Sequence, residues 1–147
     1  MFSKSTEYAL RAVIFIGQKG SAHHKLGLPE IAAAIGSPPQ FTAKIMQLLT
    51  KNKLLVSSVR GPNGGFYLTE DAKNLPVRAI LESTGEENVL TKCVLGLYQC
   101  SEAKPCPMHY DYKSIRQQMI ELFESKTIRQ LSEETQNGKI LSINGAE

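Results

Sequence analysis

The sequence predicts a mainly α-helical fold with a small β-hairpin wing, in which a winged helix-turn-helix precedes a long helix. Three observations lead to this prediction. Two short helical patterns meet at Gly36, a strand pattern with a dense turn signal follows them, and a longer helical pattern lies near the end of the chain. With 147 residues and 41% hydrophobic composition, the chain can form one domain with a core, or one domain with an arm.

The first two helices are expected from apolar spacing and capping residues. Residues 3–18 predict a helix capped by Ser3. Because apolar residues surround most of its circumference, we expect this helix to be buried against other elements or a second subunit. A short Ala-rich helix follows over Leu28–Ile35, with Pro29 near its first position and Gly36 just beyond its end.

A third helix is expected to begin at once and to run to about Lys51. Ser37 is a suitable cap, Pro38 fits the first helical position, and Gln40 completes a capping box. Four apolar residues are expected to form its buried face, namely Phe41, Ile45, Leu48 and Leu49. A separate polar stripe consists of Gln40, Lys44, Gln47 and Lys51.

Two short helices joined in this way form a helix-turn-helix pattern. In that arrangement the second helix enters the major groove of DNA, where Lys reaches guanine acceptors and Gln bonds an adenine edge. We therefore predict that the polar stripe contacts DNA. A helical hairpin in any small bundle would look similar, so the segment that follows is needed to support the prediction.

A β-hairpin is predicted directly after the third helix. Leu54–Val59 is a β-rich run, the stretch 60–65 is rich in turn-forming residues, and Phe66–Leu68 is a second short run. A hairpin in this place makes the fold a winged helix. Arg60 stands at the tip of the wing, where an Arg can insert into the narrow, electronegative minor groove. The alternative is that Arg60 is one more solvated charge in a turn.

The distribution of charge also favours a polyanionic partner. The net charge is +3, but residues 1–60 hold eight Lys and Arg against two acids, which gives +6, and residues 61–147 hold nine against twelve, which gives −3. A basic half on a nearly neutral chain is typical of a nucleic-acid-binding module. Chance clustering on a solvated face is the alternative.

The second half of the chain is expected to hold a connector at 69–74, a helix over Leu75–Thr84, and a loop over Glu86–Met108. A longer helix follows over Pro107–Ser125, with an apolar stripe of Ile115, Met119, Leu122 and Phe123. Thr127 and Gln130 then form a capping box that opens a short helix to about Glu134. The expected units are 1–84, the DNA-binding domain; 85–109, the cysteine loop; 110–135, the long helix with a short C-terminal helix; and 136–147, a flexible tail.

The chain has three cysteines, Cys93, Cys100 and Cys106, all within this loop. An odd number of cysteines without an export signal argues against a disulfide framework, so metal ligation or redox chemistry is favoured. We expect Cys106 to lie at the start of the long helix, where the positive helix end lowers the pKa of its thiol. His109 follows three residues later, so one helical turn could present both side chains to one metal.

Three thiolates and one imidazole could form a tetrahedral zinc site. The gaps of six and five residues between the cysteines are longer than those of zinc knuckles, and this favours a larger object such as an iron–sulfur cluster. Unmetallated cysteines are the remaining alternative.

Taken together, the run Ser57–Leu68, the segment Tyr8–Ala12 and the cysteine loop ending in Cys106–His109 resemble the IscR/NsrR family of bacterial regulators. The resemblance spans roughly residues 1–135. It implies a winged-helix transcription factor that binds a palindromic operator as a homodimer, with the long helix as the dimerisation helix. It also implies an iron–sulfur cluster on the three cysteines, with a 2Fe–2S cluster favoured over a 4Fe–4S cluster, that responds to cluster status, nitric oxide or redox stress.

The same resemblance offers two candidates for the fourth ligand. One is the histidine at position 109, and the other is Glu7 on the first helix, reaching from the partner subunit. A surface ion pair between Glu7 and Arg11 is the alternative role for that acid. Two departures from the assembly regulators are visible. The stretch before Cys100, which bears on ligand geometry, is one residue longer. The recognition helix differs at Pro38, Pro39 and Lys44, so the operator sequence is not carried over.

Two other classes of function are weighed against this one. A regulator of the same fold whose thiols bind zinc or sense by oxidation is the closer rival. An iron–sulfur electron carrier or a metal-dependent enzyme is the more distant one, and the sequence has no paired catalytic carboxylates, nucleophile motif or phosphate loop. The longest apolar stretch, Ala12–Gly17, is far below the roughly 20 residues of a membrane span, so we expect a cytoplasmic protein.

Overall fold

The computed structural model describes residues 1–136, and the expected tail over 136–147 lies outside this part except for its first residue. The predicted fold class is confirmed, since the described part is mainly helical and holds a two-stranded antiparallel hairpin. In chain order the elements are α1 (Lys4–Lys19), α2 (Leu28–Ile35), α3 (Pro39–Lys51), β1 (Ser57–Val59), β2 (Gly65–Tyr67), α4 (Glu70–Lys73), α5 (Arg78–Thr84), the 3-10 helix η1 (Glu87–Leu90), α6 (His109–Ser125) and α7 (Ile128–Gln136).

Helix α1 is the centre of the core, as its apolar circumference predicts. It packs against α2, α3, α5 and α7, and Ser3 caps it by accepting a hydrogen bond from the Thr6 amide at 3.3 Å. Full burial of a side chain such as Ile16 contributes roughly 1.5–3 kcal/mol. The fully buried apolar residues of α1 are Ala9, Ala12, Val13 and Ile16.

The turn between α2 and α3 forms as expected, but the capping box at its end does not. Gly36 ends α2 in the left-handed conformation, at φ 71°. Helix α3 begins at Pro39, not Pro38, and Ser37 makes no capping bond to it. The reason is the paired prolines, because Pro39 has no amide to donate to Ser37 and also holds Pro38 in extended backbone. The hydroxyl of Thr42 bonds the Pro38 carbonyl instead, at 2.9 Å.

The buried face of α3 also differs from the expected one. Ile45 and Leu49 are buried as predicted, whereas Phe41 and Leu48 are only half-buried. Thr42 and Met46 complete the face that packs into the core.

The wing follows α3 as predicted, with shorter strands. Ser57 pairs with Tyr67 and Val59 with Gly65, in antiparallel register. Leu55 and Val56 are buried in the core and are not part of the strand. A backbone bridge between Leu26 and Phe66, with N···O distances of 2.9 and 2.8 Å, ties the wing to the segment before α2.

Two predictions after the wing are wrong in detail. The stretch 69–74 contains the short helix α4, because the Thr69 hydroxyl caps it by accepting from the Ala72 amide at 3.0 Å. Helix α5 begins at Arg78, three residues later than expected, since Leu75–Val77 pairs with a distant segment. The amide of Val77 donates to the Lys126 carbonyl at 2.9 Å.

The predicted capping box before α7 is confirmed. The Gln130 amide donates to the Thr127 hydroxyl at 3.2 Å, and the Thr127 amide donates to the Gln130 side-chain oxygen at 2.9 Å. Helix α7 then packs along α1.

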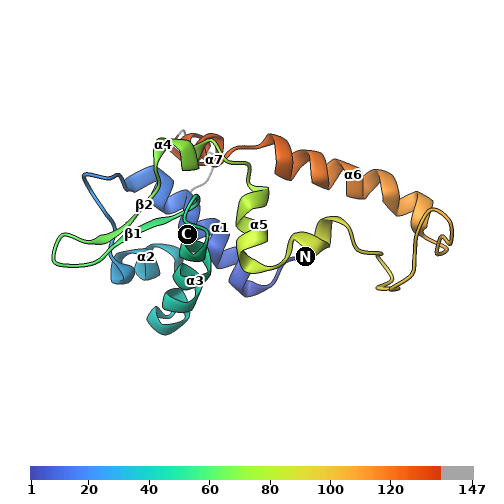
Figure 1. The fold of residues 1–147 in the computed structure, drawn as a ribbon, viewed down its shortest axis with the longest axis horizontal. Coiled ribbons are helices and arrows are strands. Elements are labelled where there is room, and N and C mark those ends of the chain that lie inside the picture. The colour runs from blue at the N-terminus through green and yellow to red at the C-terminus, as the bar shows by residue number, and fades with distance from the viewer. Residues whose placement is uncertain (137–147) are drawn as a thin grey trace.

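Helix α6 is placed differently from every other long helix of the molecule. It extends away from the helices around α1, with the cysteine loop at its far end and the wing at the opposite end of the molecule (Figure 1). Half of its predicted apolar stripe is left exposed by the described part of the chain, since Ile115 and Leu122 are 54% and 55% exposed. Met119 and Phe123 are half-buried, and Phe123 packs against the core. Within α6, the first residue, His109, is the one that is buried. Within residues 1–136, no helix has the length and apolarity to cross a bilayer.

The turn of the wing requires glycine at position 64. A Cβ there would lie 2.1 Å from the Val59 carbonyl oxygen, too close for any side chain. We expect Gly64→Ala to lower the free energy of unfolding by about 1–3 kcal/mol, as measured by urea denaturation. Gly27→Ala is the control, because a Cβ there meets nothing closer than 3.7 Å. The control should change stability by less than about 1 kcal/mol, and an equal loss in both variants would contradict the prediction.

Candidate metal centre and nucleic-acid interface

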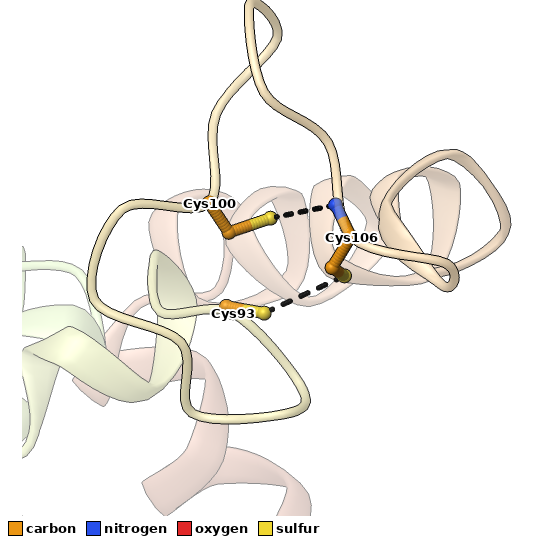
Figure 2. A group of neighbouring side chains, drawn as sticks. All are labelled: Cys93, Cys100 and Cys106. Atoms are coloured by element: carbon orange, nitrogen blue, oxygen red, sulfur yellow. Dashed lines mark hydrogen bonds between the residues drawn. The ribbon is translucent and has the colours of Figure 1, made fainter.

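The cysteine loop brings all three thiols together. The sulfur atoms of Cys93, Cys100 and Cys106 lie within 4.8 Å of one another, and their side chains point toward a common centre (Figure 2). Cys93 Sγ and Cys106 Sγ are 3.6 Å apart, and the Cys106 amide donates to Cys100 Sγ at 3.4 Å. Two of the thiols are half-buried and Cys106 is buried, so a bound group would be partly shielded from water.

The predicted effect of the helix end on Cys106 is wrong. Helix α6 begins at His109, so Cys106 lies three residues before its first turn. Burial raises the pKa of the Cys106 thiol. The thiol with a lowered pKa is that of Cys93. Its pKa falls to about 7 because the Leu97 amide, and to a lesser extent the Leu95 amide, donates a hydrogen bond to its sulfur.

His109 lies at the edge of this thiol group. Its Nδ1 is 3.3 Å from Cys100 Sγ, and its side chain is 6% exposed. The backbone places it there, because the His109 amide donates to the Cys106 carbonyl at 3.0 Å. The three sulfurs form the compact group, and the imidazole lies beside one of them.

Charged side chains of α6 hold both halves of the loop, and no sequence pattern predicts this directly. Arg116 donates to the carbonyls of Thr91 and Lys92, just before Cys93, at 3.4 and 3.3 Å. Lys113 bonds the carboxylate of Glu102, between the second and third cysteines. This bond, and after it the contact with His109, lower the pKa of Glu102. Basic residues early in the helix after the loop were the only hint.

The second candidate for a fourth ligand is placed elsewhere. Within the described residues, Glu7 forms an ion pair with Lys4 at 3.4 Å and is not part of the thiol group. The alternative role for Glu7, an ion pair with Arg11, is not found among residues 1–136. Arg11 instead donates to the Ile35 carbonyl at 3.3 Å and lies over the Tyr8 ring.

The predicted DNA-contacting residues share an exposed region formed by α3 and the wing. All five are exposed. Four lie along one polar side of α3, namely Gln40, Lys44, Gln47 and Lys51, and the fifth, Arg60, lies in the wing. A hollow of about 510 Å³ lies between the end of α3 and the wing, lined in part by Lys53, Arg60 and Tyr67. Lys53 is a cation that was not among the predicted DNA-contacting residues, although it lies between the two elements predicted to bind DNA.

Comparison with known proteins places the chain in a family. Residues 2–134 match the Rrf2 family model, described as an iron-dependent transcriptional regulator. The chain belongs to the Rrf2 family. It is thus a transcriptional regulator and not an enzyme, and its family consists of transcription factors that bind DNA.

Named relatives agree with this family. An HTH-type transcriptional regulator of Aquifex aeolicus (strain VF5) is 32% identical over 133 residues, covering 89% of this chain and 90% of that protein. The regulator NsrR of Oceanobacillus iheyensis is 27% identical, covering 98% and 96%, and the regulator IscR of Escherichia coli is 26% identical, covering 95% and 83%.

Solved structures of Rrf2 proteins share the fold. CymR of B. subtilis, titled the global cysteine regulator, superposes with a TM-score of 0.74 at 22% identity, covering 91% of this chain and 97% of that one. IscR of T. potens gives a TM-score of 0.69 at 18% identity, covering 95% and 91%. At these identities the likeness concerns the fold alone.

The thiols of this Rrf2 protein are expected to titrate separately. In the metal-free chain, alkylation of Cys93 should rise with pH and be half-maximal at about pH 7, because the thiolate is the reacting form. Cys106 should require a higher pH, since burial raises the pKa of its thiol. Mass spectrometry of alkylated peptides measures both profiles. In urea the profiles should merge near the ordinary value of about 8.5, and merged profiles in the folded chain would contradict this assignment.

Proposed function

We propose that this Rrf2 protein is an operator-binding transcription factor that senses iron–sulfur cluster status, nitric oxide or redox stress through a cluster on Cys93, Cys100 and Cys106. The observation that carries the proposal is the convergence of the three sulfurs within 4.8 Å on one loop. Thiolates are soft ligands that suit such clusters. The description of the family as iron-dependent regulators supports iron as the metal.

The residues of the loop fit a group of this kind. A hollow of about 610 Å³ opens beside Cys100 and Cys106, so a bound cluster has room on the solvent side. The loops between the thiols are longer than zinc knuckles, and a cluster spreads its ligands further apart than a single ion does. A 2Fe–2S cluster is favoured and a 4Fe–4S cluster is the alternative. When bound, the cluster supplies a redox- and nitric-oxide-sensitive group whose loss frees its ligands.

His109 is favoured as the fourth ligand. Its Nδ1 already contacts Cys100 Sγ at 3.3 Å, and its burial keeps it beside the thiols. Glu7 is the alternative, and it would act from the partner subunit, because in its own chain it pairs with Lys4.

A homodimer is part of the proposal. Helix α6 leaves part of its apolar stripe uncovered, and the exposed Ile115 and Leu122 lie two turns apart on it. A second copy of α6 is the occupant that covers this stripe symmetrically. The two α3 helices would then bind half-sites about one helical turn apart on a palindromic operator.

The contacts of α6 connect cluster status to this dimer. Arg116 and Lys113 attach the two halves of the cysteine loop to α6, so a change in the loop acts on the helix that sets the spacing of the two DNA-binding domains. A small change in spacing suffices, because both α3 helices must dock in register.

The alternative function keeps the fold and DNA binding but uses zinc-bound or redox-active thiols. It is favoured by the 3.6 Å distance between Cys93 Sγ and Cys106 Sγ and by the lowered pKa of Cys93, since both suit thiol chemistry without iron. Iron, zinc and sulfide analysis separates the two functions.

The test of the cluster is an anaerobic visible spectrum of freshly purified and reconstituted protein, with iron and sulfide assays on the same sample. We expect charge-transfer absorption and stoichiometric iron and sulfide. Cys106→Ala should lose both while its far-ultraviolet circular dichroism stays unchanged. His109→Ala should alter the spectrum and Glu7→Gln should not. Zinc without iron, or iron retained in Cys106→Ala, would refute the assignment.

The test of the DNA interface uses operator fragments at several salt concentrations. Lys44→Ala should weaken binding and reduce the log–log salt slope by about two for the dimer, about one for each subunit. Arg60→Ala should weaken binding and flatten the preference for sites with a narrow minor groove. Lys104→Ala is the control, because this exposed lysine lies on the cysteine loop at the other end of the molecule. Equal effects of Arg60→Ala and the control would remove the wing from the interface.

A further inference from the structure

The imidazole of His109 has two different environments at its two nitrogen atoms. Nδ1 faces the thiol group, 3.3 Å from Cys100 Sγ. Nε2 is buried and has no hydrogen-bond partner of good geometry within the described residues. The nearest acidic group to it is the Glu102 carboxylate, with Oε1 at 3.4 Å, which is ion-pair range. A buried polar atom without a hydrogen-bond partner costs free energy, so the Glu102 carboxylate is the group placed to reduce this cost.

Glu102 is held where it can serve Nε2. Lys113 bonds the same carboxylate oxygen and lies four residues after His109, so the two side chains project from one side of α6. Glu102 comes from the loop between Cys100 and Cys106, opposite that side of the helix. The carboxylate thus lies between one buried nitrogen and one ammonium group.

The position of the imidazole proton decides what His109 can bind. A neutral imidazole carries one N–H, and only the other nitrogen has a lone pair for a metal. An acceptor at Nε2 holds the proton there and leaves the Nδ1 lone pair directed at the thiol group. A carboxylate in this place commonly orients histidines that bind metals.

We propose that Glu102 is a positioning residue, whose carboxylate accepts a hydrogen bond from the Nε2–H of His109 and directs Nδ1 toward the three thiols, with Lys113 holding the carboxylate in place. Its role toward the cluster rests on the proposed function, with His109 as the fourth ligand. Its role toward the imidazole does not, because the three side chains are arranged in this way without metal. A mere surface ion pair between Glu102 and Lys113 would leave the tautomer of His109 independent of Glu102.

The first experiment uses the metal-free full-length protein. Nitrogen-15 NMR of the imidazoles at about pH 8.5, where an ordinary histidine is neutral, reports which nitrogen carries the proton. We expect the Nε2–H form for His109 in the native protein. Glu102→Ala should increase the Nδ1–H form, and Glu102→Gln should retain the Nε2–H form because its amide oxygen still accepts. Glu87→Gln, an exposed acid on η1, is the matched control. An unchanged tautomer in Glu102→Ala would overturn the proposal.

The second experiment uses the reconstituted protein. Glu102→Ala should lose iron about 10–100-fold more readily than the native protein in a chelator challenge, as is usual when the group that orients a ligand is removed. Glu102→Gln should restore most of this retention. Nitrogen hyperfine coupling in the paramagnetic resonance spectrum of the reduced cluster should show the histidine in the native protein and weaken in Glu102→Ala.

The outcomes separate the two proposals. If the native protein binds no iron after reconstitution, the proposed function fails, and the tautomer measurement still decides whether Glu102 positions His109. If iron binds equally well in native protein and His109→Ala, the role of Glu102 toward the cluster is overturned while the cluster itself stands. If Glu102→Ala loses iron and changes the tautomer, both proposals are supported.

Discussion

The crowding of three thiols on a loop held from outside is the constraint on which the functional half of the structure depends. Two unit charges about 4 Å apart repel by about 4 kcal/mol at an effective dielectric constant of about 20. The sulfur atoms of Cys93, Cys100 and Cys106 lie at such distances, so three thiolates without a cation would repel one another. The opposite pKa shifts of Cys93 and Cys106 follow from this environment, in which amides stabilise one thiolate and burial disfavours the other. A metal group would remove the conflict by supplying positive charge at their centre.

The constraint explains why α6 is built as it is. His109 is the buried side chain of the helix, and the basic residues Lys113 and Arg116 in its first half bond the cysteine loop. Ile115 and Leu122 remain exposed, since the core around α1 covers only the half-buried Phe123 of the predicted stripe. One element thus supports the thiol group on one side and carries the proposed dimerisation surface on another.

Local signals in the sequence predicted most of the fold, and tertiary contacts account for the failures. Gly36 and the Thr127–Gln130 box act within one turn of chain, and both formed as expected. The start of α5 was wrong because Val77 bonds Lys126, which no local pattern reveals. Ser37 is the exception, since its failure as a cap is local: Pro39 has no amide to donate to its hydroxyl.

The same distinction applies to the candidate site. Cysteine spacing was enough to select the three thiols, and the structure brings their sulfur atoms within 4.8 Å of one another. The pKa of Cys106 was predicted in the wrong direction, because the start of α6 was placed two residues too early and burial was not visible in the sequence. The contacts of Glu102 and Arg116 were not predicted, because they depend on how the loop folds back on α6. A surface acid in a loop has no sequence signature that separates it from a solvated charge.

A continuous set of contacts also joins the loop region to the DNA-binding half. Glu86 precedes η1, and its carboxylate accepts hydrogen bonds from the hydroxyls of Ser3 and Thr6 at the start of α1. These bonds hold the pKa of Glu86 below its usual range. Since α1 is the central helix of the core and packs against α3, a shift of η1 would act on the helix that braces the recognition helix. The loop region therefore has two sets of contacts, one through Arg116 and Lys113 to the proposed dimer helix, and one through Glu86 to the core of the predicted DNA-binding domain.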